Sequence, residues 1–81
     1  MIYQVVWSVP ALNRAAGFLR DDPDGLAQVM DPVDDLAADP RPDTSVTLGP
    51  EDLRRLGIDR YRVLYEITGD TVTVIHIGRL G

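Results

Sequence analysis

Two alternating runs of residues near the end of the chain, separated by Gly69-Asp70, constrain the fold most strongly. Residues 61–68 and 71–78 are rich in β-branched and aromatic side chains. A two-residue loop that begins with glycine favours a type II′ turn, whose twist matches that of paired strands. The two runs therefore predict an antiparallel β-hairpin in which Thr68 lies opposite Thr71.

This register assigns each side chain of the hairpin to one of two faces, because side chains alternate along a strand. The face expected to meet the core pairs Ile67 with Val72, Tyr65 with Val74, Val63 with His76 and Tyr61 with Gly78. The opposite face pairs Glu66 with Thr73, Leu64 with Ile75, Arg62 with Ile77 and Arg60 with Arg79. Three arginines should thus converge far from the turn. Because opposed like charges destabilise a sheet, such a cluster needs an anion, a carboxylate or good solvation.

Length and composition indicate one small domain. The chain has 81 residues, 44% of them hydrophobic, which suffices for one hydrophobic core. We therefore expect a single domain that comprises residues 1–81. It has no cysteine and one histidine, so we expect neither a disulfide framework nor a metal site, and no cofactor. The N-terminus does not resemble a signal peptide, and no apolar run is long enough to span a membrane. A soluble cytoplasmic protein without membrane contact is the expectation.

Charge is distributed unevenly along the chain. Residues 1–40 contain seven aspartates and two arginines, a net charge of −5, whereas residues 41–81 contain six acids and six arginines. Nonspecific affinity for nucleic acid comes from neutralised phosphates and released counterions. An acidic protein of this kind can bind nucleic acid only through a local basic face.

The remaining pattern predicts a strand, two helices and two further short strands. Residues 2–7 form the first strand, and Ser8 with Pro10 begins a helix that stops near Asp21-Asp22-Pro23. Apolar stripes at helical spacing mark the two helices: Leu12, Ala15, Ala16 and Leu19, then Leu26, Val29, Met30, Val33, Leu36 and Ala37. We expect Leu12, Leu19, Leu26, Val29 and Val33 to pack in the core against the hairpin. Pro32 should kink or restart the second helix near Asp31.

An extended connector, residues 39–43, then leads to short strands at residues 45–48 and 53–56. The order of elements predicts an α+β domain: an N-terminal strand, a two-helix hairpin, and an antiparallel meander of three or four strands with the helices on one face. The other face of the sheet should stay partly open.

Several segments occur together in an order that is typical of one family: Tyr3-Gln4-Val5-Val6-Trp7, Asp39-Pro40-Arg41-Pro42, Leu53-Arg54-Arg55-Leu56, Tyr61-Arg62-Val63-Leu64-Tyr65-Glu66-Ile67 and Val74-Ile75-His76-Ile77-Gly78-Arg79. Over nearly its whole length the chain resembles the RelE/ParE superfamily of bacterial toxin–antitoxin toxins, with the RelE-like branch favoured. The resemblance implies a toxin that a cognate antitoxin neutralises, with a toxin–antitoxin hetero-oligomer as one form of the complex.

In the RelE-like branch the resemblance further implies a ribosome-dependent, metal-independent endoribonuclease that cuts mRNA in the ribosomal A site. Attack by the 2′-hydroxyl requires a base, cations for the charge that develops on the phosphate, and an acid for the leaving oxygen. By position in the family pattern, Arg62, Arg79 and Arg55 are the catalytic candidates, and Arg54 and Arg60 are candidates for RNA binding. The chain departs from the family in having no lysine and no tyrosine after Gly78.

Two other functions stay open. A ParE-like member would poison DNA gyrase by binding it, and a degenerate member would bind only its antitoxin. The residues themselves also have ordinary structural interpretations. By the register above, His76 should pack in the core rather than act in catalysis, and Glu66 should be a charge partner of Arg62 rather than a base. Arg54 and Arg55 point to opposite faces, so at most one of them can join the arginine cluster.

Overall fold

The computed structural model describes residues 2–80, so Met1 and Gly81, the two ends of the predicted domain, lie outside the described residues. The elements, in chain order, are β1 Gln4–Trp7, α1 Val9–Asp21, α2 Pro23–Asp34, the 3₁₀ turn η1 Asp35–Ala37, β2 Ser45–Thr47, β3 Leu53–Ile58, β4 Tyr61–Thr68 and β5 Thr71–Arg79. The predicted α+β class and order of elements are confirmed. Within residues 2–80, the helices are too short or too polar to cross a membrane.

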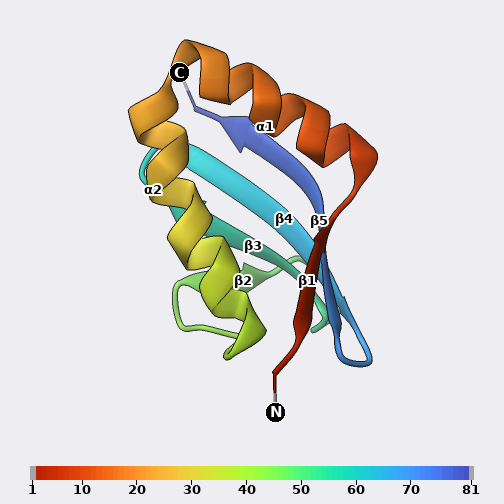
Figure 1. Ribbon diagram of the computed structural model, residues 1–81. Coiled ribbons are helices and arrows are strands. Elements are labelled where there is room, and N and C mark those ends of the chain that lie inside the picture. Colours follow the sequence, from red (N-terminus) through yellow and green to blue (C-terminus); the bar gives the residue numbers. More distant parts are fainter. Residues whose placement is uncertain (1, 81) are drawn as a thin grey trace.

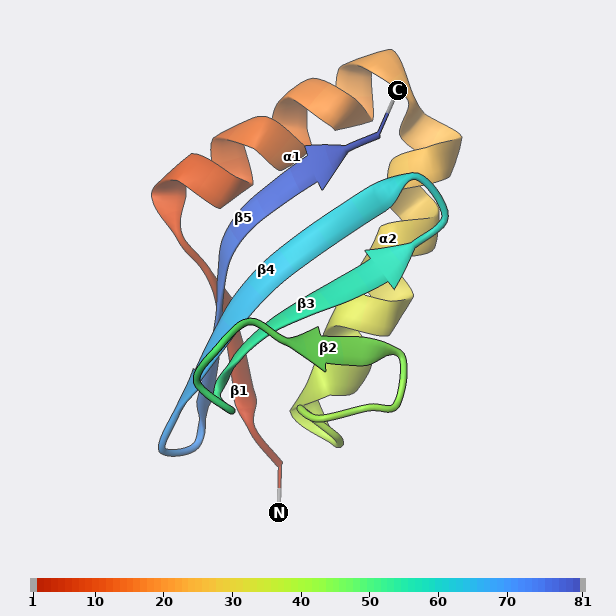
Figure 2. The same cartoon turned by 180° about the vertical axis from the view of Figure 1, so that it is seen from behind.

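The strands form one five-stranded sheet in the order β1-β5-β4-β3-β2. Strands β2 to β5 are an antiparallel meander, and β1 adds to its edge parallel to β5. Both helices lie on the same face of this sheet (Figure 1). Seen from behind, the other face carries no helix, so β5, β4 and β3 lie in the foreground (Figure 2). We call this second side the open face.

The ends of the helices follow their local sequence. Ser8 caps α1, its side-chain oxygen accepting a hydrogen bond from the Ala11 N–H at 3.3 Å. Asp22 separates the two helices and caps α2 by accepting from the Gly25 N–H at 3.1 Å. Pro32 lies in the last turn of α2, which continues to Asp34 before the 3₁₀ turn begins. The helix therefore does not restart near Asp31 as expected; it runs through the proline and tightens into the 3₁₀ turn at Asp35, three residues later.

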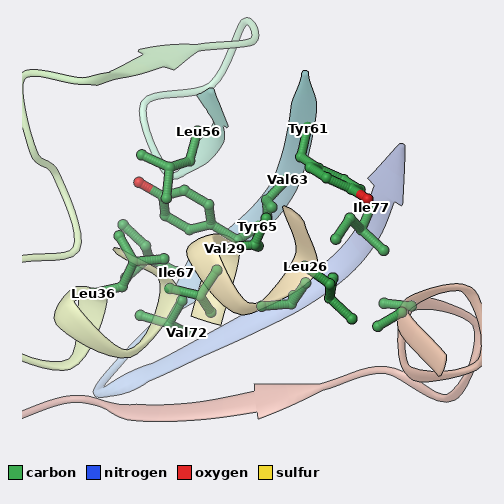
Figure 3. Packing of buried hydrophobic residues seen from close by; sticks show 14 residues of the cluster. Leu26, Val29, Leu36, Leu56, Tyr61, Val63, Tyr65, Ile67, Val72 and Ile77 are labelled. Atoms are coloured by element: carbon green, nitrogen blue, oxygen red, sulfur yellow. The ribbon is translucent and has the colours of Figure 1, made fainter. Parts of the chain in front are cut away.

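The core lies between the helices and the sheet (Figure 3). Its members are Ala11, Ala15, Leu26, Val29, Val33, Leu36, Leu56, Tyr61, Val63, Tyr65, Ile67, Val72, Val74 and Ile77. The inward residues predicted for the hairpin near its turn are confirmed. In α1, however, Leu12 and Leu19 are 56% and 52% exposed, because the helix turns the small Ala11 and Ala15 toward the sheet instead. Assigning these leucines to the core was wrong.

The hairpin follows the predicted register only halfway. Thr68 pairs with Thr71 and Tyr65 with Val74, and Gly69 has a φ of +60°, as a type II′ turn requires at its first position. Beyond that point a β-bulge leaves Ile75 without a partner, so that Leu64 pairs with His76. Every later residue of β5 is therefore displaced by one position relative to the prediction.

The bulge exchanges which residues of β5 face the core. Ile77 is fully buried, while Ile75 and His76 are exposed on the open face. Burying an isoleucine stabilises a small domain by about 1.5 to 3 kcal/mol, whereas a buried imidazole would need a polar partner. The interpretation of His76 as a packed core residue is therefore wrong.

Candidate functional site

Arg62 lies on the open face of β4 between two glycines. Its partner in β3 is Gly57 and its partner in β5 is Gly78, so no side chain flanks it across either strand. Neighbouring strands are about 4.8 Å apart, which leaves the Cα atoms of the two glycines about 10 Å from each other. The row Gly57–Arg62–Gly78 is therefore a shallow strip in which the guanidinium can be approached from solvent.

The guanidinium of Arg62 is held in one position by the end of the β3–β4 turn. Its Nη1 donates to the carbonyl oxygens of Asp59 at 2.9 Å and of Tyr61 at 2.8 Å. A Cβ on Gly57 would stand only 3.5 Å from Nη1, so the group lies directly over that glycine. Its Nε and Nη2 donate no hydrogen bond to any described residue. They are oriented donors for an anion, such as a phosphate group.

His76 lies on the opposite side of the same row. It pairs with Leu64, and its Nε2 would stand 3.3 Å from a Cβ on Gly78. The imidazole thus leans over Gly78 just as the guanidinium leans over Gly57, with the backbone of Arg62 between them. One glycine-lined strip therefore carries a fixed cation on one side and a group able to accept or donate a proton on the other.

The rest of the open face around this strip is mixed. Arg55 is exposed and pairs with Leu64, so it lies in the same cross-strand row as His76. Glu66 is the next residue of β4 on the open face after Leu64, two pairs further along, and lies opposite Thr73. Within residues 2–80 the ion pairs are Arg41 with Asp52 and Arg60 with Asp22, so the expected pairing of Glu66 with Arg62 does not form. We call Arg62, His76 and Arg55, with the glycine strip, the candidate site.

The other predicted site residues lie elsewhere. Arg54 shares the helix-covered face with its partner Tyr65 and donates from Nε to the buried Ser45 hydroxyl at 2.8 Å. Arg79 pairs with Tyr61 and its guanidinium lies 5.0 Å from the centre of the Phe18 ring in α1. The predicted convergence of Arg60, Arg62 and Arg79 on one face is therefore wrong. The bulge explains the position of Arg79, because it places every residue of β5 after Ile75 on the opposite face from the one predicted.

Arg60 and Arg79 instead belong to the junction between the two helices and the sheet. Asp22 accepts a hydrogen bond from the Tyr61 hydroxyl at 3.0 Å and lies 3.6 Å from the Arg60 guanidinium. The Tyr61 hydrogen bond, the Gly25 N–H and the charges of both arginines hold the pKa of Asp22 below its usual value. Phe18 meets Tyr61 edge-on at 5.4 Å. These contacts fix the helical hairpin to the sheet.

His76 is the residue of the candidate site that strict alternation misses. One signal in the sequence could have found it, because regular pairing places His76 in the core and the adjacent Ile77 in solvent. An apolar pattern that slips by one residue along a strand indicates a bulge. In the structure β1 also stops pairing with β5 directly before the bulge: Trp7 pairs with Val74, and the Ser8 N–H donates to the Val74 carbonyl at 2.9 Å.

This fold is shared with solved structures of small toxin–antitoxin proteins. The chain is similar to a structure of the chromosomal ParDE system of P. aeruginosa, with a TM-score of 0.80, 10% identity and coverage of 99% of this chain and 98% of that one. It is likewise similar to the RelBE2 toxin–antitoxin complex of Mycobacterium tuberculosis, with a TM-score of 0.80, 23% identity and coverage of 98% and 92%. For the archaeal RelE–RelB complex of Pyrococcus horikoshii OT3 the TM-score is 0.81, the identity 19% and the coverage 100% and 98%.

A family model identifies the chain more closely. The model described as the ParE toxin of the type II toxin–antitoxin system, parDE, matches residues 6–80. The chain therefore belongs to this family, which lies within the RelE/ParE superfamily. The curated protein sequences contain no match to it.

Proposed function

We propose that this toxin cleaves mRNA on the ribosome, using the candidate site on its open face. One observation carries the proposal: Arg62 and His76 lie on either side of a single glycine-lined strip that no helix covers. A phosphodiester placed in this strip can contact the free Nε and Nη2 of Arg62 while one of its ribose hydroxyls faces the imidazole. Arg55, in the row of His76, adds a second cation for the flanking phosphate.

The proposed reaction needs only the substrate and these side chains. The imidazole of His76, in its neutral form, takes the proton of the ribose 2′-hydroxyl as the 2′-oxygen bonds to the adjacent phosphorus. The bond from phosphorus to the 5′-oxygen breaks, and that oxygen takes a proton from water. The products are a 2′,3′-cyclic phosphate and a 5′-hydroxyl. Arg62 stabilises the extra negative charge on the non-bridging oxygens during this step.

Cleavage of an mRNA on programmed ribosomes, mapped by primer extension in the presence of EDTA, tests the proposal. Arg62→Ala should cut about 100-fold more slowly, because a positioned cation at developing phosphate charge is typically worth about 3 to 4 kcal/mol. Arg20→Ala, which removes an exposed arginine from α1, is the matched control and should cut normally. If the wild-type protein cuts nothing with ribosomes present, the nuclease proposal fails.

The role of His76 has its own test. His76→Ala should lower cleavage by about 100-fold, the usual contribution of a positioned proton-transfer group. Because the side chain is exposed, the variant should melt within a few degrees of wild type. Added imidazole should restore part of the lost activity to this variant and none to Arg62→Ala. Normal cutting by His76→Ala would leave the nuclease in place but remove His76 from it.

A second candidate function is inhibition of DNA gyrase by binding. The withdrawal of Arg60 and Arg79 from the open face favours it, since this leaves fewer cations for an RNA substrate on a chain of net charge −5. A supercoiling assay with purified gyrase distinguishes the two. Inhibition of supercoiling without any mRNA cleavage would establish this alternative, and neither effect would indicate a member that only binds its antitoxin.

The partner that we propose for this chain is a cognate antitoxin. The similar structures from Mycobacterium tuberculosis and Pyrococcus horikoshii are described as toxin–antitoxin and RelE–RelB complexes. Because ribosomes and gyrase are both in the cytoplasm, we propose that the protein acts there. Co-expression with the product of the neighbouring reading frame, followed by size-exclusion chromatography, should give one stable complex.

A further inference from the structure

Two apolar side chains on the open face border the candidate site. Leu64 lies two residues along β4 from Arg62, so their Cα atoms are about 7 Å apart. The bulge leaves Ile75 beside Leu64 on β5, 36% exposed on the sheet face that no helix covers (Figure 2). We call Leu64 and Ile75 the apolar shelf. Because His76 pairs with Leu64, the shelf continues directly from the glycine strip.

The next position of β4 on the open face supplies a carboxylate. Glu66 is exposed and lies between Leu53 of β3 and Thr73 of β5. Its Oε1 accepts a long hydrogen bond from the Thr68 hydroxyl at 3.5 Å, and within residues 2–80 no cation lies within 4.0 Å of it. An ionised carboxylate can only accept hydrogen bonds. Glu66 therefore offers acceptors to a ligand that brings its own donors.

These groups follow one another in the order of the parts of a nucleotide. Arg62, Leu64 and Glu66 lie in line along β4, about 7 Å apart from one to the next. In the proposed reaction the phosphate contacts Arg62 and the 2′-hydroxyl faces His76, which lies on the shelf side of the glycine strip. The nucleotide that supplies this hydroxyl, directly 5′ of the cut, then extends over the shelf. The outer edge of its base faces Glu66.

The four bases differ in what they present to a carboxylate. Guanine carries two adjacent donors, N1–H and the 2-amino group, so the two oxygens of one carboxylate can accept from both at once. Adenine and cytosine each carry an amino donor next to a ring-nitrogen acceptor, and uracil has its donor between two carbonyl acceptors. An acceptor held against a carboxylate is repelled. Of the four bases, guanine is therefore the one that fits Glu66 best.

We propose that Leu64, Ile75 and Glu66 form a subsite for a guanine base. The shelf contacts the face of the base, as apolar side chains do in other nucleotide pockets, and Glu66 accepts hydrogen bonds from its N1–H and 2-amino groups. Glu66 is thus a specificity-determining residue. The assignment of this base to the nucleotide 5′ of the cut rests on the proposed function, whereas the chemistry of the subsite does not.

Cleavage mapping on programmed ribosomes, with mRNAs that vary the nucleotide 5′ of the cut, gives the first test. The wild-type protein should cut after guanine about tenfold or more faster than after any other base, as expected for a bidentate contact. Glu66→Gln presents one acceptor and one donor, so it should cut after adenine at least as fast as after guanine. Equal base profiles of Glu66→Gln and wild type overturn the inference.

The chain contains a matched control for this substitution. Glu51 is its other glutamate and is exposed in the turn before β3. Glu51→Gln removes the same charge outside the open face, so it should keep the preference for guanine. Both variants should melt within a few degrees of wild type, because both side chains are exposed.

A mononucleotide tests the subsite without ribosomes or cleavage. Guanosine 3′-monophosphate carries the base, the 2′-hydroxyl and the phosphate of the nucleotide 5′ of the cut. In an NMR titration its shift changes should centre on the amides of Leu64, Glu66 and Ile75. It should bind about tenfold more tightly than adenosine 3′-monophosphate, and Glu66→Gln should remove this difference.

The two measurements separate the subsite from the nuclease. If the wild-type protein cuts nothing on ribosomes while the guanosine nucleotide binds with the expected preference, the subsite stands and the nuclease proposal fails. If mRNA is cut but the two nucleotides bind equally well, the inference is overturned and the nuclease proposal stands.

Discussion

Individual arginines in this chain acquire different roles from their neighbours. Arg62 keeps free donors because glycines occupy both adjacent strands, and two backbone carbonyls hold it in place. Arg60 and Arg79, which the sequence places beside it, are used at the helix–sheet junction against Asp22 and Phe18. The same type of side chain thus belongs to the exposed candidate site in one place and makes structural contacts in another.

Gly57 should be as important for the candidate site as the arginine that lies over it. In Gly57→Val the methyl groups would occupy the position of the Arg62 guanidinium, since a Cβ there is already 3.5 Å from Nη1. Valine favours strands, so the fold should be kept while mRNA cleavage falls by about tenfold or more through displacement of the cation. Gly57→Ala, whose single methyl makes an ordinary contact, is the control and should retain most activity. Equal activity of the two variants would contradict the inferred position of Arg62.

Asp22 should make stability depend on pH in the acid range. Its pKa is lowered in the folded state, first by the Tyr61 hydroxyl and then by the Gly25 N–H and nearby arginines. A lowered folded pKa gives stabilisation that is complete above the unfolded value of about 3.9 and is lost as the pH falls through the folded pKa. Asp22→Asn should therefore lower the melting temperature at pH 7 and have a smaller effect near pH 3. Thermal melts of both proteins across this range measure the difference, and parallel curves would contradict it.

At the scale of elements, the β-bulge of β5 decides the composition of both faces of the sheet. It is placed where β1 ends, so that the unpaired edge of β5 is completed by other groups. The Ser8 hydroxyl donates to the Ile75 carbonyl at 3.4 Å and Arg14 Nε donates to the Ile77 carbonyl at 2.7 Å. A single extra residue in one strand thus moves His76 to the open face and Arg79 to the junction.

Two single-residue deletions should distinguish the effect of the bulge on stability from the role of His76 in cleavage. Removing either Ile75 or His76 makes β5 regular without changing the pairing of Tyr65 with Val74 or the burial of Ile77. Both variants should therefore fold, with a loss of stability of no more than about 2 kcal/mol. Only the deletion of His76 should lower mRNA cleavage by about 100-fold, because the other variant retains an imidazole opposite Leu64. Circular dichroism and the ribosome assay on each variant test this. Unfolding of both would show that the bulge itself is indispensable.

At the scale of the whole molecule, one buried hydroxyl joins the connector to the centre of the sheet. Tyr65 is fully buried in β4, and its hydroxyl donates to the Pro40 carbonyl at 2.7 Å. Tyr65→Phe leaves that carbonyl without a partner and should lower the free energy of unfolding by about 1 to 3 kcal/mol. Tyr61→Phe should have a smaller effect, because Asp22 keeps its bonds to Gly25 and Arg60. Urea denaturation of both variants compares them, and the reverse order would refute this account.

The sequence by itself determined the order of elements, the helix start at Ser8, the end of the first helix near Asp22, and the hairpin near Gly69. All of these depend on contacts between residues close in the chain: alternation, helical spacing, turn chemistry and capping. They also suffice to place Arg62 on the open face, since Val63 beside it must be buried.

Only the tertiary structure decided the rest of the candidate site. Whether β5 stays regular depends on which of its side chains the two helices cover, and on the residue at which β1 stops pairing with it. The bulge at Ile75 therefore follows from packing between segments distant in the sequence. The direction of α1 is likewise set by how closely Ala11 and Ala15 approach the sheet, which leaves Leu12 and Leu19 exposed. Alternation assigns faces correctly until a strand gains a residue, and the free energy that favours this gain comes from the burial of Ile77 against elements distant in the sequence.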